Sequence, residues 1–178
     1  MVGILILNYN SVRDTIACIS SVREFCPPRS YVLCVVDNCS RSEVVDKVRA
    51  SLREGDKYIL GAENVGYARG NNLGLEYFDT VDDVDKILIL NNDILLTRDI
   101  VTPLTEYLDS HPSCGAVSPL LRDRNGDIDL SCARRFKSPR DLAIKAGSLG
   151  RLGIRTREFM LRDTPSLMDG EEIPVDLP

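Results

Sequence analysis

The stretch YVLCVVDNCS, residues 31–40, indicates the fold class of this chain. Its first part is apolar on both faces and rich in β-branched side chains, which is typical of a parallel strand that helices cover from both sides. The apolar run stops at Asp37, and Ser40 with Glu43 resembles the capping box of a following helix. The pattern predicts a buried strand that leads into a helix through a short polar loop.

The same alternation continues on both sides of this stretch. Apolar strands are also predicted at residues 3–8, 57–60 and 86–90, and helices at residues 11–25, 40–53, 70–78 and from Thr97 to Pro112. Strands and helices that alternate over short connections form right-handed crossovers and a mostly parallel sheet. We therefore expect an α/β fold, a Rossmann-like sheet with helices on both faces. Farther along, residues 116–118 are predicted as a strand, and Asn125 with Gly126 predicts a turn into a hairpin arm at residues 128–132.

The composition is that of one ordinary globular domain. The 178 residues are 43% hydrophobic and 28% charged, with a formal net charge of −5. The cysteines are spread without a C-x-x-C pair, so we expect reduced thiols, several of them buried, and no disulfide framework. The single His111 precedes Pro112 at a predicted helix end, which gives no support to a Ser-His-Asp or Cys-His catalytic pair.

We expect a cytoplasmic protein without a nucleic-acid partner.

Basic residues gather in one part of the chain. Residues 134–157 carry eight basic side chains and one acid, a net charge of +7 in a chain whose total is −5. Two interpretations stay open. The segment is a solvated surface stretch, or it makes a peripheral contact with anionic lipid or a lipid-diphosphate acceptor at the inner membrane face.

Polar clusters follow three of the predicted strands. The run NYN at residues 8–10 follows the first strand, DN at residues 37–38 follows the second, and NND at residues 91–93 follows the fourth. Because ligands of parallel sheets bind beyond the carboxyl ends of the strands, these clusters predict one ligand site. Neither G-x-G-x-x-G nor G-x-x-x-x-G-K-[ST] follows the first strand, so both common nucleotide motifs are missing. Asp37 either accepts hydrogen bonds from a base or ribose, or caps a helix or turn.

Two further motifs each allow a structural and a functional interpretation. Asp93 is either a turn acid or one oxygen ligand of a Mg²⁺ or Mn²⁺ ion whose other positions a diphosphate and water fill. The stretch NVGYARGNNLG, residues 64–74, has glycines four apart. These glycines either let a helix approach another backbone closely, or leave Arg69 and free backbone amides to face an anionic ligand.

The runs VVDNCS, NVGYARGNNLG and ILILNND, at residues 35–40, 64–74 and 87–93, together resemble glycosyltransferase family 2. The likeness covers about residues 3–136 and is greatest to the rhamnosyltransferase-type branch that builds bacterial surface polysaccharide. It implies the GT-A fold and an inverting hexosyltransferase that moves a sugar from a nucleotide-diphosphate sugar to a glycan or lipid-linked acceptor. It also implies a nucleotide-sugar-binding core at residues 1–133 and a partial acceptor-side region at residues 134–178.

The resemblance assigns roles to individual residues. Nucleotide-sugar binding would fall to Asn8, Asn10, Asp37 at the base, Asn64, Gly66, Arg69, Asn91 and Asn92, and metal binding to Asp93. Residues 91–93 stand where the family has its D-x-D motif, with Asn91 in place of the first acid. A divalent cofactor, Mn²⁺ or Mg²⁺, is therefore expected to depend on one carboxylate.

The catalytic base is not matched. Inversion needs a base that deprotonates the acceptor hydroxyl. The family places this carboxylate beyond the strand that here begins at Ile173, and the chain ends at Pro178, so we expect it to be truncated. Glu171, Glu172 and Asp176 lie near the right region. Two other classes compete: a nucleotide-sugar-binding fragment or pseudoenzyme without turnover, and a nucleotidyltransferase, which would need a Gly-rich phosphate loop after the first strand.

Overall fold

The computed structural model describes residues 1–129 of the chain. The chain separates into two compact units, Met1–Asp109 and Ser110–Pro178, which are described one at a time. The predicted division at residue 133 lies outside the described residues and stays a prediction.

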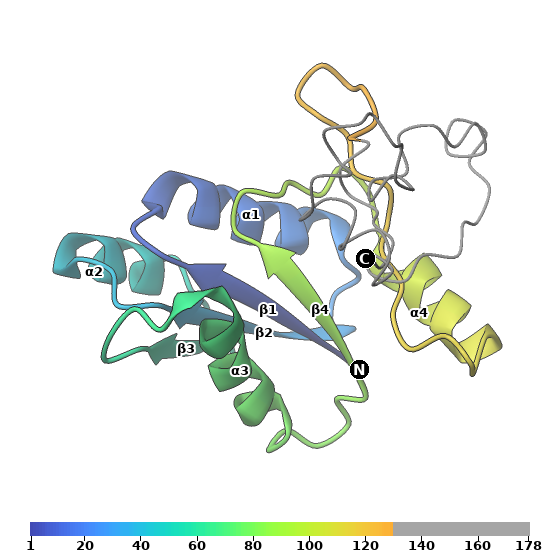
Figure 1. Ribbon diagram of the computed structural model, residues 1–178, viewed down its shortest axis with the longest axis horizontal. Coiled ribbons are helices and arrows are strands. Elements are labelled where there is room, and N and C mark those ends of the chain that lie inside the picture. Colours follow the sequence, from blue (N-terminus) through green and yellow to red (C-terminus); the bar gives the residue numbers. More distant parts are fainter. Residues whose placement is uncertain (130–178) are drawn as a thin grey trace, which may run out of the picture. The chain divides into compact units, whose positions relative to one another are not determined.

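The first unit holds a four-stranded parallel sheet (Figure 1). Its elements are β1 (Val2–Asn8), α1 (Val12–Phe25), β2 (Tyr31–Asp37), α2 (Ser42–Ala50), β3 (Lys57–Leu60), α3 (Gly66–Phe78), β4 (Lys86–Asn91) and α4 (Val101–Ser110). The strand order is β3-β2-β1-β4, and every neighbouring pair is parallel. The predicted parallel α/β sheet is confirmed.

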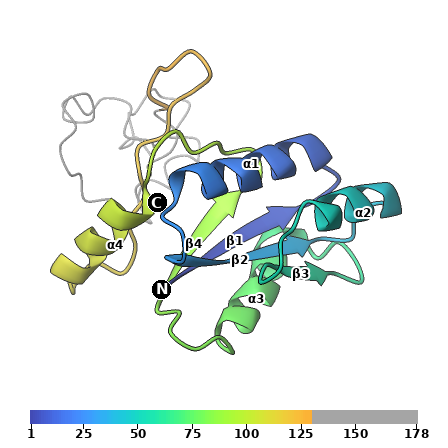
Figure 2. The ribbon, with the colours of Figure 1, turned by 180° about the vertical axis from the view of Figure 1, so that it is seen from behind.

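Helices cover both faces of the sheet, with α1 and α2 on one side and α3 on the other (Figure 2). Successive strand residues alternate between the two faces. Ile4 and Ile6 pack in the core that α1 and α2 cover, whereas Leu5 and Val36 pack with Phe78 of α3. Each fully buried aliphatic side chain of this kind contributes roughly 1.5–3 kcal/mol, so the strands carry much of the core.

Two glycines allow α3 to lie close against β1. A Cβ atom at Gly70 would lie 2.8 Å from Leu7 Cδ1, and one at Gly74 would overlap Leu5. The packing interpretation of the glycine spacing is therefore confirmed for these two positions. Gly66 has a different role, because it begins α3 with a φ of +82°, a conformation that other residues rarely adopt.

Three predicted helix starts are wrong. Helix α2 begins after Arg41, and Ser40 makes tertiary contacts instead of capping it. Helix α3 begins at Gly66, one turn before the predicted residue 70. Helix α4 begins at Val101, not at Thr97, because the Asp99 carboxylate accepts hydrogen bonds from the backbone N–H groups of Val101 and Thr102 at 2.9 and 3.2 Å.

The described part of the second unit, residues 110–129, includes a tight turn at residues 123–127. Asp123 Oδ1 accepts hydrogen bonds from the backbone N–H groups of Asn125 and Asp127 at 2.8 and 3.0 Å, and Arg122 bridges Ile128 in antiparallel fashion. The Asn-Gly turn is confirmed. The strand predicted at residues 116–118 is wrong, because this stretch has no strand geometry and no pairing partner among residues 110–129.

The cysteines of the described residues are free thiols, as expected. Burial raises the pKa of Cys18 and Cys34 to about 12 and that of Cys26 to about 11, which keeps these thiols protonated and unreactive. Cys39 is exposed. Within residues 1–129, no helix has both the length and the apolar character needed to cross a bilayer.

Candidate functional site

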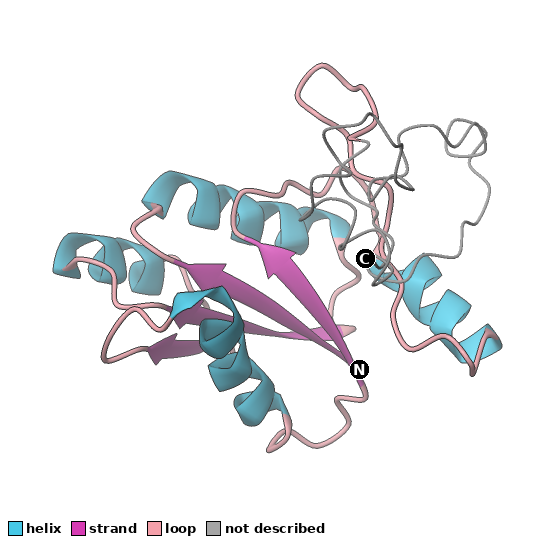
Figure 3. Ribbon diagram, in the orientation of Figure 1, coloured by secondary structure: helices cyan, strands magenta, loops and turns pink. Residues whose placement is uncertain are grey.

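The predicted polar clusters meet at one edge of the sheet. Asn8, Asp37 and Asn91 end β1, β2 and β4, and these strands run in the same direction (Figure 3). Asn8 is in register with Asp37. The strand ends therefore lie together, and that they form one ligand site stays a prediction.

Asp37 is fully buried, and both of its carboxylate oxygens accept hydrogen bonds from the protein. Asn8 Nδ2 donates to Oδ2 at 2.6 Å, and the backbone N–H of Ser40 donates to Oδ1 at 2.6 Å. Burial raises the pKa of the neighbouring Tyr58 hydroxyl, and the charge of Asp37 raises it further. A buried carboxylate held by two donors fixes the loop that follows β2. Direct contact between Asp37 and a base stays a prediction.

Asn8 also links the end of β2 to α1 and, through Thr15, to the turn after β4. Thr15 Oγ1 donates to Asn8 Oδ1 at 2.8 Å, and Asn92 Nδ2 donates to Thr15 Oγ1 at 3.0 Å. Asn8 and Thr15 are fully buried. We call Asp37, Asn8, Thr15 and Asn92 the polar relay. It joins the ends of three strands through side chains that are distant in sequence.

The loops after β1 and β2 are also fastened directly to each other. The backbone N–H of Asn10 donates to Ser40 Oγ at 2.7 Å, and the N–H of Arg41 donates to Asn10 Oδ1 at 3.0 Å. Asn10 and Cys39 have positive φ values of 54° and 65°. Such left-handed residues cost about 1–3 kcal/mol each and persist where surrounding contacts hold them, often at functional sites.

Asn38 connects the end of β2 to the start of α3. Its Nδ2 donates to Asn64 Oδ1 at 2.9 Å and to the carbonyl oxygen of Gly66 at 3.2 Å, and its Oδ1 accepts from the N–H of Val65 at 3.0 Å. Asn64 Oδ1 also accepts from the N–H of Gly66 at 3.0 Å. The predicted residues Asn64 and Gly66 therefore lie beside the loop that follows Asp37.

The NND run forms a turn that two helices hold. The N–H of Ile94 donates to the carbonyl oxygen of Asn91 at 3.1 Å, which closes the turn. Tyr67 of α3 donates its hydroxyl hydrogen to Asn91 Oδ1 at 2.9 Å, and Thr15 of α1 accepts from Asn92. Asp93, the next residue, is exposed. The turn therefore presents one free carboxylate beside a fixed pair of amides.

The predicted site residues divide into a buried frame and an exposed rim. Asn8 and Asp37 belong to the frame, and Asn92 is half-buried. The exposed residues are Asn10, Asn64, Gly66, Arg69, Asn91 and Asp93. The Tyr9 and Tyr67 side chains, 51% and 59% exposed, add aromatic surface beside them. The rim thus offers amides, a guanidinium, a carboxylate and aromatic rings.

The sequence placed Asn38 in a polar cluster at a strand end without a role of its own, and it did not indicate Tyr67, Ser40 or Thr15 as site residues. Thr15 had a detectable signal, because it continues the helical stripe of Cys18, Ile19 and Val22 as a polar residue. A hydroxyl in an otherwise apolar stripe needs a buried partner.

The metal prediction has limited support in this geometry. No group of at least three His, Cys, Asp or Glu side chains that could hold a metal ion occurs within residues 1–129. Asp93 alone is not a metal cage. Its exposed carboxylate fits the smaller task of giving one oxygen to a cation that a diphosphate also binds.

Comparison with known proteins adds relatives of known class. The curated low-salt glycan biosynthesis hexosyltransferase Agl10 of the archaeon Haloferax volcanii is 31% identical over 130 residues, which cover 70% of this chain and 38% of the relative. The crystal structure of S. aureus TarS matches with a TM-score of 0.50 and 18% identity over 69% of this chain and 24% of TarS. TarS residues 1–349 in complex with UDP-GlcNAc match with a TM-score of 0.51 and 19% identity over 66% of this chain and 36% of that chain.

These findings establish the fold and the family. The structural likeness, at less than one fifth identity, shows that the α/β sheet is of the GT-A type. The chain spans less than half the length of these relatives. Residues 3–155 match the sequence family described as glycosyl transferase family 2. The chain therefore belongs to glycosyltransferase family 2.

Proposed function

We propose that this chain binds a nucleotide-diphosphate sugar and takes part in an inverting transfer of the sugar to a glycan or lipid-linked acceptor. The rhamnosyltransferase-type branch and the core at residues 1–133 are parts of this proposal. The observation that carries it is the polar relay, which fixes the ligand edge of the sheet under an exposed polar rim. The hexosyltransferase relative and the UDP-GlcNAc complex of TarS support a donor of this class.

The rim residues suit the parts of such a donor. Asn10, Asn64 and Gly66 border the loops where a nucleotide would lie, and Arg69 and Asn91 offer donors to its phosphates or sugar. Asp93 would hold the divalent cation, which would neutralise the diphosphate as it leaves. For Asp37, the two hydrogen bonds favour a frame role, in which it fixes the loop next to the base.

The acceptor side of the reaction depends on residues outside the described part. Glu171, Glu172 and Asp176, the carboxylates nearest the expected base, lie there, as does the basic segment 134–157. A binding domain without turnover is therefore the second candidate. We also propose peripheral contact of residues 134–157 with anionic lipid. Co-sedimentation with anionic vesicles that is lost at high salt, and lost on changing Arg151, Arg155 and Arg157 to Gln, would support this contact.

The test of the main proposal is calorimetric titration with uridine and thymidine diphosphates and their sugars, followed by a transfer assay. We expect binding of at least one pyrimidine nucleotide diphosphate. Binding with no donor-dependent transfer would favour the second candidate, since loss of a general base costs about 10²–10⁴ in rate. No binding of any of these nucleotides to folded protein would refute the proposal.

A further inference from the structure

Thr15 occupies an unusual position for a helix residue. It is fully buried in α1, yet its hydroxyl contacts the end of β1 and the turn after β4 rather than its own helix. A hydroxyl has one hydrogen to donate and lone pairs to accept with. Thr15 uses the hydrogen for Asn8 and a lone pair for Asn92.

The charge of Asp37 sets the direction of every bond in the polar relay. A carboxylate only accepts hydrogen bonds, so Asn8 must turn its NH₂ group toward Asp37 and its oxygen toward Thr15. Thr15 must then donate to Asn8, which leaves its lone pairs for the NH₂ group of Asn92. The amide oxygen of Asn92 is therefore the end of the relay that a ligand can use. Asn92 is half-buried and precedes the exposed Asp93.

We propose that Thr15 is a positioning residue for donor binding: by accepting from Nδ2 of Asn92, it leaves the Asn92 amide oxygen to the ligand beside Asp93. An amide oxygen is a hard donor that suits a divalent cation, as the Asp93 carboxylate does. The inference rests on the proposed function and adds to it a residue in α1 that touches no ligand itself.

The first test needs no ligand and measures amide hydrogen exchange. Thr15→Val keeps the shape of the side chain and removes the hydroxyl. It should speed exchange at the N–H of Ser40 and at the N–H of Ile94 together, because both ends of the relay lose their link. Thr15→Ser should behave as the wild type. Faster exchange at only one of the two ends, or at neither, would overturn the inference.

Ser21 offers a matched control on the same helix. It is buried, and its hydroxyl donates to the carbonyl oxygen of Cys18 at 2.8 Å and accepts from the N–H of Leu96 at 3.1 Å. Ser21→Ala should speed exchange at Leu96 and leave Ser40 unchanged. Equal effects of the Ser21 and Thr15 changes at Ser40 would show general loosening of α1 and overturn the inference.

The second test compares uridine diphosphate affinity with Mn²⁺ and with EDTA. Loss of a residue that orients a metal ligand typically costs 10–100-fold, so Thr15→Val should reduce the Mn²⁺ enhancement by about 10-fold or more. Thr15→Ser and Ser21→Ala should keep it. If Thr15→Val does not fold, Asn92→Ala, at a half-buried turn position, should give the same loss. A full Mn²⁺ enhancement in Thr15→Val or Asn92→Ala would overturn the inference. Absence of nucleotide binding by the wild type would instead refute the proposed function, and hydrogen exchange would still decide the role of Thr15.

Discussion

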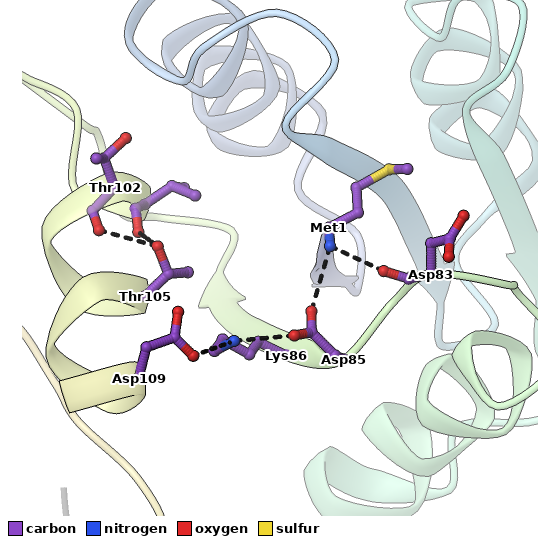
Figure 4. A network of polar contacts seen from close by, with 8 residues as sticks. Met1, Asp83, Asp85, Lys86, Thr102, Thr105 and Asp109 are labelled. Atoms are coloured by element: carbon purple, nitrogen blue, oxygen red, sulfur yellow. Dashed lines mark hydrogen bonds and ion pairs between the residues drawn. The ribbon is translucent and has the colours of Figure 1, made fainter. Parts of the chain in front are cut away.

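The carboxyl end of the sheet and the amino ends of β1 and β4 are fastened by different kinds of interaction. At the carboxyl end, the polar relay surrounds one buried carboxylate with the buried Asn8 amide, the buried Thr15 hydroxyl and the half-buried Asn92 amide. At the amino ends of β1 and β4, ion pairs hold the elements (Figure 4). There the Met1 ammonium group lies 3.2 Å from Asp85, and Lys86 Nζ lies 2.9 Å from Asp85 and 2.8 Å from Asp109 of α4. The side chains of Asp85 and Asp109 are 61% and 66% exposed.

This difference shows where the protein requires one fixed conformation. Exposed ion pairs are screened by water and salt, so they hold α4 near β4 but tolerate exchange of partners. Buried polar groups are costly when any partner is missing, so the relay permits few alternatives. By this criterion the carboxyl end is fixed more tightly than the amino ends of β1 and β4, and it is the end where the family resemblance placed the donor.

The largest expected effect is that of removing a carboxylate from each end. Asp37→Ala removes the carboxylate acceptor of the buried Asn8 NH₂ group and of the half-buried Ser40 N–H, and should lower the free energy of unfolding by about 3 kcal/mol. Asp85→Ala should lower it by less than about 1 kcal/mol. Urea denaturation followed by circular dichroism measures both. Equal losses would break the distinction between the two ends.

A smaller effect is expected on nucleotide affinity in Mn²⁺. Asp93→Asn removes the one exposed carboxylate of the turn, and should abolish a Mn²⁺ enhancement that we expect to be about 10-fold. Asp109→Asn, at another exposed acid, which lies at the amino end, is the control and should keep the enhancement. Equal affinity of the wild type in EDTA and in Mn²⁺ would make Asp93 a turn acid.

Thiol labelling should sharpen the map of the carboxyl end. Cys39 is exposed between Asn38 and Ser40, whereas Cys18 and Cys34 are buried with pKa values raised to about 12. At pH 8, iodoacetamide should modify Cys39 first and the two buried thiols only after denaturation. Uridine diphosphate should slow the Cys39 reaction. Peptide mass spectrometry gives the order in which the thiols are modified. A Cys39 labelling rate that does not change on addition of the nucleotide would place the ligand elsewhere.

The smallest effect is the acid sensitivity of the amino end. Hydrogen bonds from Lys86 and from the N-terminus lower the pKa of Asp85 to about 2. Because this folded-state pKa is below the unfolded value of about 4, the stabilisation is present above pH 4 and is lost as the pH falls toward 2. Lys86→Gln should therefore differ slightly from the wild type in thermal unfolding at pH 6, and by less at pH 2. An undiminished difference at pH 2 would assign the effect to packing.

Local patterns predicted the sheet well because each strand is an apolar run with its own boundary. For example, the run of apolar residues that includes Leu33, Val35 and Val36 predicts a strand that is buried on both faces, and these residues are buried. The polar strand ends were also readable, because topology alone brings Asn8 and Asp37 together.

Tertiary partners decided what the sequence left open. Ser40 with Glu43 fits a capping box, but in the fold the Ser40 hydroxyl accepts from the N–H of Asn10, a residue distant in sequence. The burial of Asp37 likewise depends on tertiary structure, because its hydrogen-bond donors are Asn8 of β1 and Ser40 in the loop after β2. Neither pairing leaves a periodic trace in the sequence.

The most direct test of the account is a map of backbone amide shifts in ¹⁵N-labelled protein on addition of uridine diphosphate and Mn²⁺. We predict changes at residues 8–11, 37–41, 64–69 and 91–94, and none at residues 79–86 and 102–109. Changes centred on the amino-end residues, or no change anywhere at millimolar nucleotide, would contradict it.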